Sequence, residues 1–422
     1  MIMLSNEAKQ TLRNQLKAFG EQVQRLSPNH RAEARQLFEK LQLKGAIQAL
    51  TPLEYCSQSV LELASRSLKE YEPTYAIDGG STRLQRLENG TLVCAYQAVL
   101  SSDPDTRYKD LPLEAFRSLS LVSHSQRTDL GGAKSQQFPN EYVHFWRVHI
   151  SRTYLEHEVE RVVGSLARMA AESYHALRML KELSPKQGLF IVDGNLYPIG
   201  LYYYLTGEDD IWPEENGPKT SWTEWKPAIE ILAQPVRVVE AFRERGLALV
   251  GLNKNPGTSW LLEFTLDRES HNWSNDAQFI RAVLSGTPKD ALGYTNWFVQ
   301  EGYSLPQRRG ESVESFDIFE RLSSFGLLHA PKAYHVCFFY LFDPRVKAVL
   351  KVEAPRIVFE KHDPEKLRAQ VLAEIAQGKG VPPAIRRADS RARITEEESA
   401  SLIRACGVEL DLSYNQSRSE MI

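Results

Sequence analysis

Cysteines and long apolar runs are both scarce in this sequence, and each shortage argues against a class of protein. The four cysteines stand far apart and form no CxxC pair, which disfavours a zinc ribbon or a disulfide-bonded scaffold. No apolar run approaches the ~20 residues needed to cross a bilayer. The first ten residues, MIMLSNEAKQ, become polar too early for a signal peptide. We therefore expect a cytoplasmic protein with reduced thiols and no membrane contact.

The sequence also lacks an excess of basic charge and the glycine-rich loops that bind nucleotides. It contains 51 basic and 54 acidic residues, a balance that gives no general attraction to nucleic acid. Contact with phosphates must therefore come from a local basic patch or from bound metal. Neither GxxxxGK[ST] nor GxGxxG occurs, which disfavours a chain that itself powers movement along DNA.

The order of the helical and strand patterns predicts a mixed α/β fold. A chain of 422 residues exceeds the roughly 250–300 residues of a single core, so we expect two domains or one domain with large insertions. Helical periodicity predicts an N-terminal helical segment over 1–70, followed by a main domain over 71–422. A mixed β-sheet flanked by helices fits the order of the remaining patterns best.

Particular segments carry this prediction. Helices are predicted over about 151–183 and 235–245, and again over 364–376. Buried strands are predicted over 189–192, 247–252, 333–342 and 346–352. Polar or turn-rich stretches near 101–140, 205–226 and 265–330 are predicted insertions.

Two of the strand-like segments end in an Asp-Gly pair. They are YAIDGGS, which contains Asp78, and FIVDGNL, which contains Asp193. The glycine lets the chain turn with positive φ or lets a ligand approach the backbone. Open α/β sheets bind their ligands at strand ends, and hard oxygen ligands suit divalent cations. The two aspartates are therefore candidate metal ligands, and the alternative is that each pair is an ordinary turn.

A third carboxylate follows from the geometry of the helix that precedes Asp193. The strand leading to Asp193 spans roughly 16 Å. Going back roughly 16 Å from the helix end, at ~1.5 Å per residue, reaches Glu172. Glu158 occupies the same flank of the helix but lies about 21 Å further along. We therefore select Glu172 as the helix carboxylate; the alternative is an exposed surface glutamate. Three such carboxylates would hold one or two Mg²⁺ or Mn²⁺ ions, as phosphodiester hydrolysis requires.

Basic side chains accompany these carboxylates. Lys254 directly follows the strand LALVGL, which would let its ammonium group reach a phosphate at the same sheet edge. A basic segment near the C-terminus contains Asp389 between its arginines. We interpret it as a helix that contacts DNA phosphates and carries a further metal ligand, Asp389; the alternative is a solvated basic surface. Its predicted DNA-binding residues are Arg386, Arg387, Arg391 and Arg393.

Several short blocks together resemble the NurA family of DNA double-strand break repair nucleases. In family order they are AIDGGS, RMAAES, FIVDGNL, VGLNKN and the closing GVPPAIRRADSRARIT. They are scattered over roughly residues 70–400, and the pair of Asp-Gly motifs is the most specific of them. The resemblance implies an RNase H-like (Piwi-like) fold and a Mn²⁺-dependent active site.

The same resemblance implies an activity and partners. Family members act on DNA as single-strand endonucleases and 5′→3′ exonucleases, and they work as dimers with a hexameric HerA-type ATPase in end resection. The metal-ligand roles fall on Asp78, Glu172 and Asp193, with Lys254 beside the phosphate. Two positions depart from the family pattern: Asp389 stands where a histidine is frequent, and Val381 replaces the usual tyrosine. An aspartate binds Mn²⁺ but does not act as an imidazole acid.

Two other function classes remain open. The DGGST stretch that begins at Asp78 resembles the first phosphate loop of the sugar-kinase and actin-like ATPases. Against that class, the second motif is Asp-Gly-Asn, and no Gly-Gly pair follows this second motif to bind adenosine. The third class is a non-catalytic partner of a DNA-processing ATPase. A nuclease assay separates the three.

Overall fold

The structure is a computed structural model in which contacts divide the chain into two compact units. One unit comprises residues 1–46 and 257–286, and the other comprises 47–256 and 287–422. The sequence-based division into 1–70 and 71–422 stays a prediction. The described residues are 5–24, 30–43, 47–52, 54–66, 68–105, 117–125, 134–138, 142–150, 156–198, 200–201, 222–258, 261–262, 273–300, 303–304, 315–316, 318–323, 326–395, 397–399 and 401.

The first unit is helical. It contains α1 (Asn6–Gln24), α2 (His30–Leu43) and α8 (Asp276–Val283). Helix α2 packs on α8, where the rings of Phe38 and Phe279 have centroids 6.2 Å apart. Helices α1 and α2 confirm the helical periodicity of residues 6–24 and 30–43. The prediction of a helical segment is wrong further along, because strands β1 (Gln48–Ala49) and β2 (Tyr55–Ser59) lie within 1–70 and pair with the large sheet.

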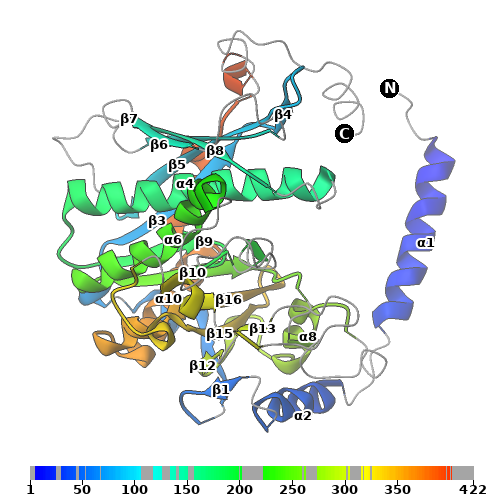
Figure 1. Ribbon diagram of the computed structural model, residues 1–422. Helices are drawn as coiled ribbons and strands as arrows, with labels where there is room; N and C mark the ends of the chain where they lie inside the picture. Colours follow the sequence, from blue (N-terminus) through cyan, green and yellow to red (C-terminus); the bar gives the residue numbers. More distant parts are fainter. Residues whose placement is uncertain are drawn as a thin grey trace. The chain divides into compact units, whose positions relative to one another are not determined.

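The second unit is built on a mixed sheet, which Figure 1 shows descending from β7 near the top to β1 near the bottom. Strand β3 is parallel to β9, which is parallel to β10, and most other neighbours are antiparallel. The strands in order are β1 (Gln48–Ala49), β12 (Phe298–Val299), β15 (Val336–Asp343), β16 (Ala348–Pro355), β10 (Ala248–Lys254), β9 (Leu189–Asp193), β3 (Thr74–Ser81), β5 (Leu92–Asp103), β6 (Arg117–His124), β8 (Val143–Val148) and β7 (Lys134–Phe138). Three more strands pair off this path: β2 (Tyr55–Ser59), β4 (Gln85–Arg86) and β11 (Ala291–Thr295).

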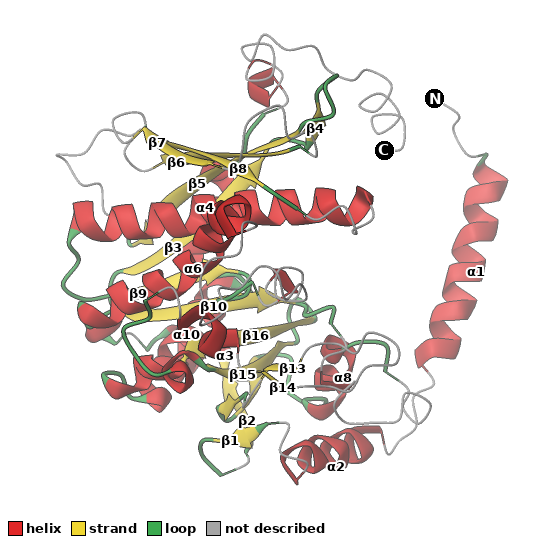
Figure 2. Ribbon diagram, in the orientation of Figure 1, coloured by secondary structure: helices red, strands yellow, loops and turns green. Residues whose placement is uncertain are grey.

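Helices cover both faces of this sheet, as Figure 2 shows for the layers around β3, β9 and β10. Because side chains alternate along a strand, Ala76 and Ile191 point to one face and Ile77 and Val192 to the other. The first pair joins the core formed with α10 and α11. The second pair faces α4 and α6. Among the described residues, the α-helices of this unit include α3 (Val60–Ala64), α4 (Glu156–Leu183), α6 (Trp222–Glu244), α9 (Ile318–Leu322), α10 (Pro364–Gly378) and α11 (Pro383–Ala392).

The predicted fold class, a mixed β-sheet flanked by helices, is therefore confirmed. The helix predicted to start at Pro235 starts instead at Trp222 and carries Pro235 in its interior. Burial of the helix against its neighbours, as at Ile229 and Leu232, offsets the backbone hydrogen bond that a proline removes. In the described part of the chain, no helix combines the length and apolar character needed to span a membrane.

The segments predicted as insertions differ in outcome. The range 101–140, predicted from its polar and turn-rich sequence to be an insertion or a loop, contains strands β6 and β7 of the large sheet. The serines of β6 obscured the strand pattern because several of them are buried in the sheet. The range 265–330 supplies β11 and β12 to the same sheet. Most of 205–226 lies outside the described residues, except where α6 begins.

Candidate active site

Two parallel strands bring Asp78 and Asp193 to one edge of the sheet. In the register of β3 and β9, Ile77 pairs with Val192, which places the two aspartates side by side at the next position. Lys254 ends the neighbouring strand β10, and its Nζ lies 2.7 Å from Asp193 Oδ2. The three side chains therefore meet, as the strand-end prediction required. The expectation that Lys254 contacts a phosphate stays a prediction, because here the ammonium group pairs with a carboxylate.

Glu172 reaches the same edge from the opposite face of the sheet. Helix α4 lies on the face of Ile77 and Val192, and Glu172 is only 5% exposed. Its Oε1 accepts hydrogen bonds from Arg168 Nε at 2.9 Å and from the Tyr96 hydroxyl at 3.3 Å. Glu172, which the lengths of the helix and the strand predict to be the nearest helix carboxylate, therefore lies at the end of β9.

The two Asp-Gly pairs use their glycines differently. Gly194 has a φ of +112°, so the chain turns there in the region that favours glycine. Gly79 has no such φ, and it instead leaves room for a neighbour. A Cβ at Gly79 would lie 2.1 Å from Tyr96 Cε1. The glycine after Asp78 therefore admits the tyrosine ring that reaches Glu172.

The carboxylates repel one another electrostatically. Burial, followed by the charge of Asp193, raises the pKa of Asp78 to about 7, and Glu172 and Asp389 add smaller contributions. The hydrogen bond from Gly79 N–H to Asp78 Oδ1, 2.7 Å long, opposes this rise. Burial also raises the pKa of Glu172, against the lowering effect of Arg168. These groups therefore lie close enough to influence one another, which is the condition for a shared cation.

Helix α11 supplies Asp389 and rests directly on β3. A Cβ at Gly80 would lie 2.3 Å from the Ala392 carbonyl oxygen, and Gln97 Nε2 donates to the same oxygen at 3.3 Å. This contact holds the end of α11 against the edge that carries Asp78. Asp389 itself is exposed, and its influence on Asp78 is the weakest of the three neighbouring carboxylates.

Three of the four predicted DNA-binding arginines are engaged within the protein. Arg386 donates to the Gly378 carbonyl, and Arg387 donates to the Ser102 carbonyl and pairs with Asp103. Arg391 pairs with Asp105 at 3.2 Å. Arg393 is exposed and lies beyond the helix, whose last residue is Ala392. DNA binding by the four arginines stays a prediction, and the geometry favours Arg393 among them.

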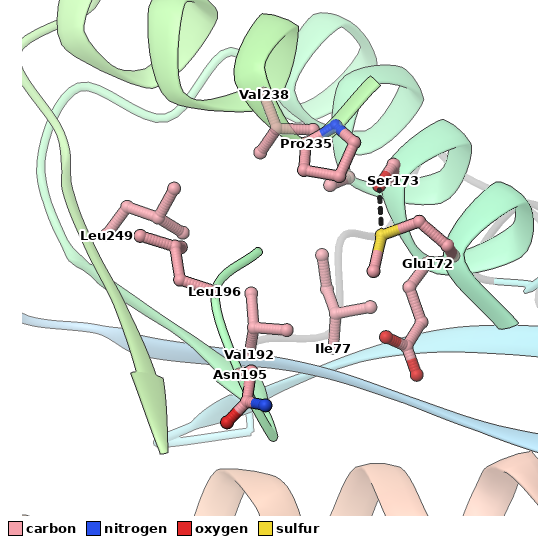
Figure 3. Close-up of a pocket in the computed structure, with 11 residues that line it drawn as sticks. Ile77, Glu172, Ser173, Val192, Asn195, Leu196, Pro235, Val238 and Leu249 are labelled. Atoms are coloured by element: carbon pink, nitrogen blue, oxygen red, sulfur yellow. Dashed lines mark hydrogen bonds between the residues drawn. The ribbon is translucent and has the colours of Figure 1, made fainter. Parts of the chain in front are cut away.

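An apolar cavity lies next to Glu172, between the sheet and helices α4 and α6 (Figure 3). Pro235, Val238 and Leu249 form much of its wall, and the Glu172 carboxylate points away from them toward the strands. Its volume of about 30 Å³ holds about one water molecule. It is too small for a nucleobase, and its apolar lining accounts for the burial that raises the Glu172 pKa.

The donor set of this edge fits a divalent cation. Asp78, Glu172 and Asp193 each use one oxygen toward a protein donor. Within the described residues, the second oxygen of each has no protein partner. Over the same described residues, no three His, Cys, Asp or Glu side chains form a ready-made metal cluster. The carboxylates therefore offer hard oxygen ligands, while Lys254 and Arg168 balance part of their charge.

Two site residues were not predicted from the sequence: Arg168 and Tyr96. Arg168 stands four residues before Glu172 on one helix, and such a spacing allows a direct ion pair. The block RMAAES contains this spacing, so the ion pair has a signal in the sequence. Tyr96 lies on β5, and its approach to Glu172 depends on the pairing of β5 with β3, which no local pattern reveals.

Comparison with known proteins identifies the family of this chain. Among solved structures, the chain is similar to the NurA nuclease from Sulfolobus solfataricus, with 11% identity, a TM-score of 0.46, and coverage of 96% of this chain and 97% of that one. It is also similar to a NurA structure bound to dAMP and manganese, with 10% identity, a TM-score of 0.42, and coverage of 94% and 97%. A sequence search of curated proteins finds no match. The NurA domain matches residues 72–394, a range that includes every carboxylate described above, and the chain therefore belongs to the NurA family.

Proposed function

We propose that this protein is a divalent-metal-dependent DNA nuclease that acts as a single-strand endonuclease and a 5′→3′ exonuclease. The observation that carries the proposal is the meeting of Asp78, Glu172 and Asp193 at one sheet edge, where the charges of Asp193 and Glu172 both help to raise the pKa of Asp78. Family membership supports the same activity. One related NurA structure holds dAMP and manganese, which supports Mn²⁺ as the metal and DNA as the substrate.

The roles of the residues follow from their positions. Asp78, Glu172 and Asp193 would hold the metal, probed as Mn²⁺ or Mg²⁺ and expected as two ions, and Asp389 would add a further oxygen ligand. Bound divalent ions supply an activated water and stabilise the charge on the leaving oxygen. Lys254, now paired with Asp193, lies at the same edge and would turn its ammonium group to a phosphate of the DNA strand.

The proposal includes a cellular setting. We place the protein in the cytoplasm, as a homodimer that works with a HerA-like hexameric ATPase in the resection of double-strand breaks. The sequence supports a separate motor because it contains no P-loop. The RNase H-like nature of the fold belongs to the same proposal.

A cleavage assay tests the proposed activity. Purified full-length protein is incubated with labelled single-stranded DNA and Mn²⁺, and the variants Asp78→Asn, Asp193→Asn and Glu172→Gln are compared with wild type. Since metal ions contribute several kcal/mol to the transition state, each variant should lose at least about a hundredfold in rate. Glu158→Gln on the same helix is the matched control and should keep wild-type activity.

The alternatives give different results in the same assay. Cleavage that survives Asp78→Asn and Asp193→Asn would refute the assignment of the site. ATP hydrolysis without DNA cleavage would favour the sugar-kinase-like class. A wild-type protein that neither cleaves DNA nor hydrolyses ATP would favour the class of non-catalytic partners. Activity lost in Glu158→Gln but kept in Glu172→Gln would show that the helix carboxylate was chosen wrongly.

A further inference from the structure

We infer that Arg168, assisted by Tyr96, is a positioning residue that holds one oxygen of Glu172 and directs the other toward the divalent ion. This inference rests on the proposed function, because it concerns how the same site binds its metal. It adds two residues that belong to neither the Asp-Gly motifs nor the basic segment of α11.

Both donors contact the same carboxylate oxygen. Arg168 Nε lies 2.9 Å from Glu172 Oε1, and the Tyr96 hydroxyl lies 3.3 Å from that atom. Within the described part of the chain, Glu172 Oε2 has no protein partner. A carboxylate held by two donors at one oxygen keeps a fixed orientation, and its other oxygen is available to a metal ion. That arrangement suits a metal ligand oriented by its neighbours.

Arg168 also links Glu172 to the strand that carries Asp193. Its Nη2 donates a hydrogen bond to the Asp193 carbonyl oxygen. A Cβ at Gly194 would lie 2.7 Å from the same Nη2, so the absence of a side chain at Gly194 leaves room for the guanidinium group. One planar group therefore fixes the spacing between a residue of α4 and the end of β9. A lysine, with a single ammonium nitrogen, cannot make the same two contacts in the same geometry.

Tyr96 contributes the second contact from the neighbouring strand. Its hydroxyl lies 3.1 Å from the Gly79 carbonyl oxygen as well as 3.3 Å from Glu172 Oε1. Since a hydroxyl has one proton, it donates to only one of these oxygens at a time. Tyr96 is therefore the weaker of the two positioning groups.

A simple competition between Arg168 and the metal predicts the opposite behaviour. In that case, removal of the guanidinium would free the carboxylate and tighten metal binding. The contacts argue for positioning instead, because Arg168 occupies Oε1 and leaves Oε2 open. Removal of Arg168 should therefore weaken metal binding, since Glu172 would lose its fixed orientation.

Direct metal binding separates these outcomes without any use of activity. The affinity of the full-length protein for Mn²⁺ is measured by electron paramagnetic resonance of free Mn²⁺. Loss of an outer partner of a metal ligand weakens affinity by about 10–100-fold, and we expect this for Arg168→Met and Arg168→Lys. Tyr96→Phe should weaken it less, by about two- to tenfold. Arg161→Gln, an exposed position of the same helix, is the control and should bind Mn²⁺ like wild type.

Thermal unfolding of each metal-free variant checks that it is folded, and Tyr96→Phe, which keeps the ring beside Gly79, tests the inference if the Arg168 variants do not fold. Unchanged or tighter Mn²⁺ binding in the folded variants would overturn the positioning role, and so would full recovery by Arg168→Lys. Failure of the proposed function looks different: the wild-type protein would cut no DNA, whatever the affinities of the variants. The two failures are therefore distinguishable.

Discussion

Replacement of Asp78 by asparagine should stabilise the metal-free protein, and more so as the pH rises. The pKa of Asp78 is raised from 3.8 to about 7 in the folded protein. Between these values the folded protein binds more protons at this group than the unfolded chain does, so the free energy of unfolding falls as the pH rises. Asparagine has no charge to bury, and its side-chain oxygen still accepts the hydrogen bond from Gly79 N–H.

The magnitude follows from the size of the shift. Between pH 5 and pH 7 the wild-type protein should lose up to about 3 kcal/mol of stability through this group, at 1.36 kcal/mol per pKa unit. A further loss of less than about 1 kcal/mol follows above pH 7, because half of the Asp78 carboxyl groups are still protonated at their pKa, and the loss is nearly complete at pH 8. Because Asp78 is coupled electrostatically to neighbouring carboxylates, we expect a loss of about 1–3 kcal/mol. This corresponds to a fall in melting temperature of about 2–6 °C.

Melting temperatures in EDTA at pH 5, 6, 7 and 8 measure the effect. The wild-type curve should fall relative to that of Asp78→Asn up to about pH 8, most steeply below pH 7. Addition of Mn²⁺ at pH 8 should restore the wild-type protein, because the cation stabilises the ionised carboxylate, and should have less effect on the variant. Parallel curves over the whole pH range would refute the argument that Asp78 is buried among like charges.

Two further predictions concern the surroundings of the carboxylates. A Cβ at Gly251 would lie 2.8 Å from Leu196 N and 2.9 Å from the Gly194 carbonyl oxygen, so Gly251→Ala should displace the turn after Asp193. Calorimetry should show a destabilisation of about 1–3 kcal/mol, together with weaker Mn²⁺ binding, and wild-type values for both would contradict this reasoning. Arg393→Gln should weaken single-stranded DNA binding and reduce its salt slope by about one, whereas Arg391→Gln, whose arginine already pairs with Asp105, should have a smaller effect. Fluorescence anisotropy over a series of salt concentrations measures the DNA affinity of both variants. An equal loss of affinity in the two would show that Arg393 does not contact DNA more strongly than Arg391 does.

The sequence predicts where the three carboxylates lie in the fold because each position follows a local rule, and their role as metal ligands stays a prediction. Asp78 and Asp193 end apolar strands and precede glycines, and parallel strands end at the same edge. Glu172 follows from the rise per residue of a helix and a strand that run back along each other. These inferences need only local geometry and one assumption about the direction of the chain.

The sequence does not predict the contacts that cross between elements. Tyr96 reaches Glu172 only because β5 pairs with β3 in a register that places Tyr96 opposite Ser81. No nearby residue in the sequence identifies a partner for Arg387 or Arg391. Their partners, Asp103 and Asp105, lie more than 280 residues away along the chain. Such pairings depend on the tertiary fold, which local propensity does not contain.

The packing of α11 on β3 has a consequence for folding during synthesis on the ribosome. Gln97 and Ala392, which meet there, are separated by 295 residues of sequence. Contacts of such long range form late, because a large loop must close before they contribute. A ribosome adds about 5–20 residues per second, so a nascent chain spends many seconds with this edge of β3 uncovered. The carboxylate edge therefore reaches its final form only after nearly the whole protein has been synthesised.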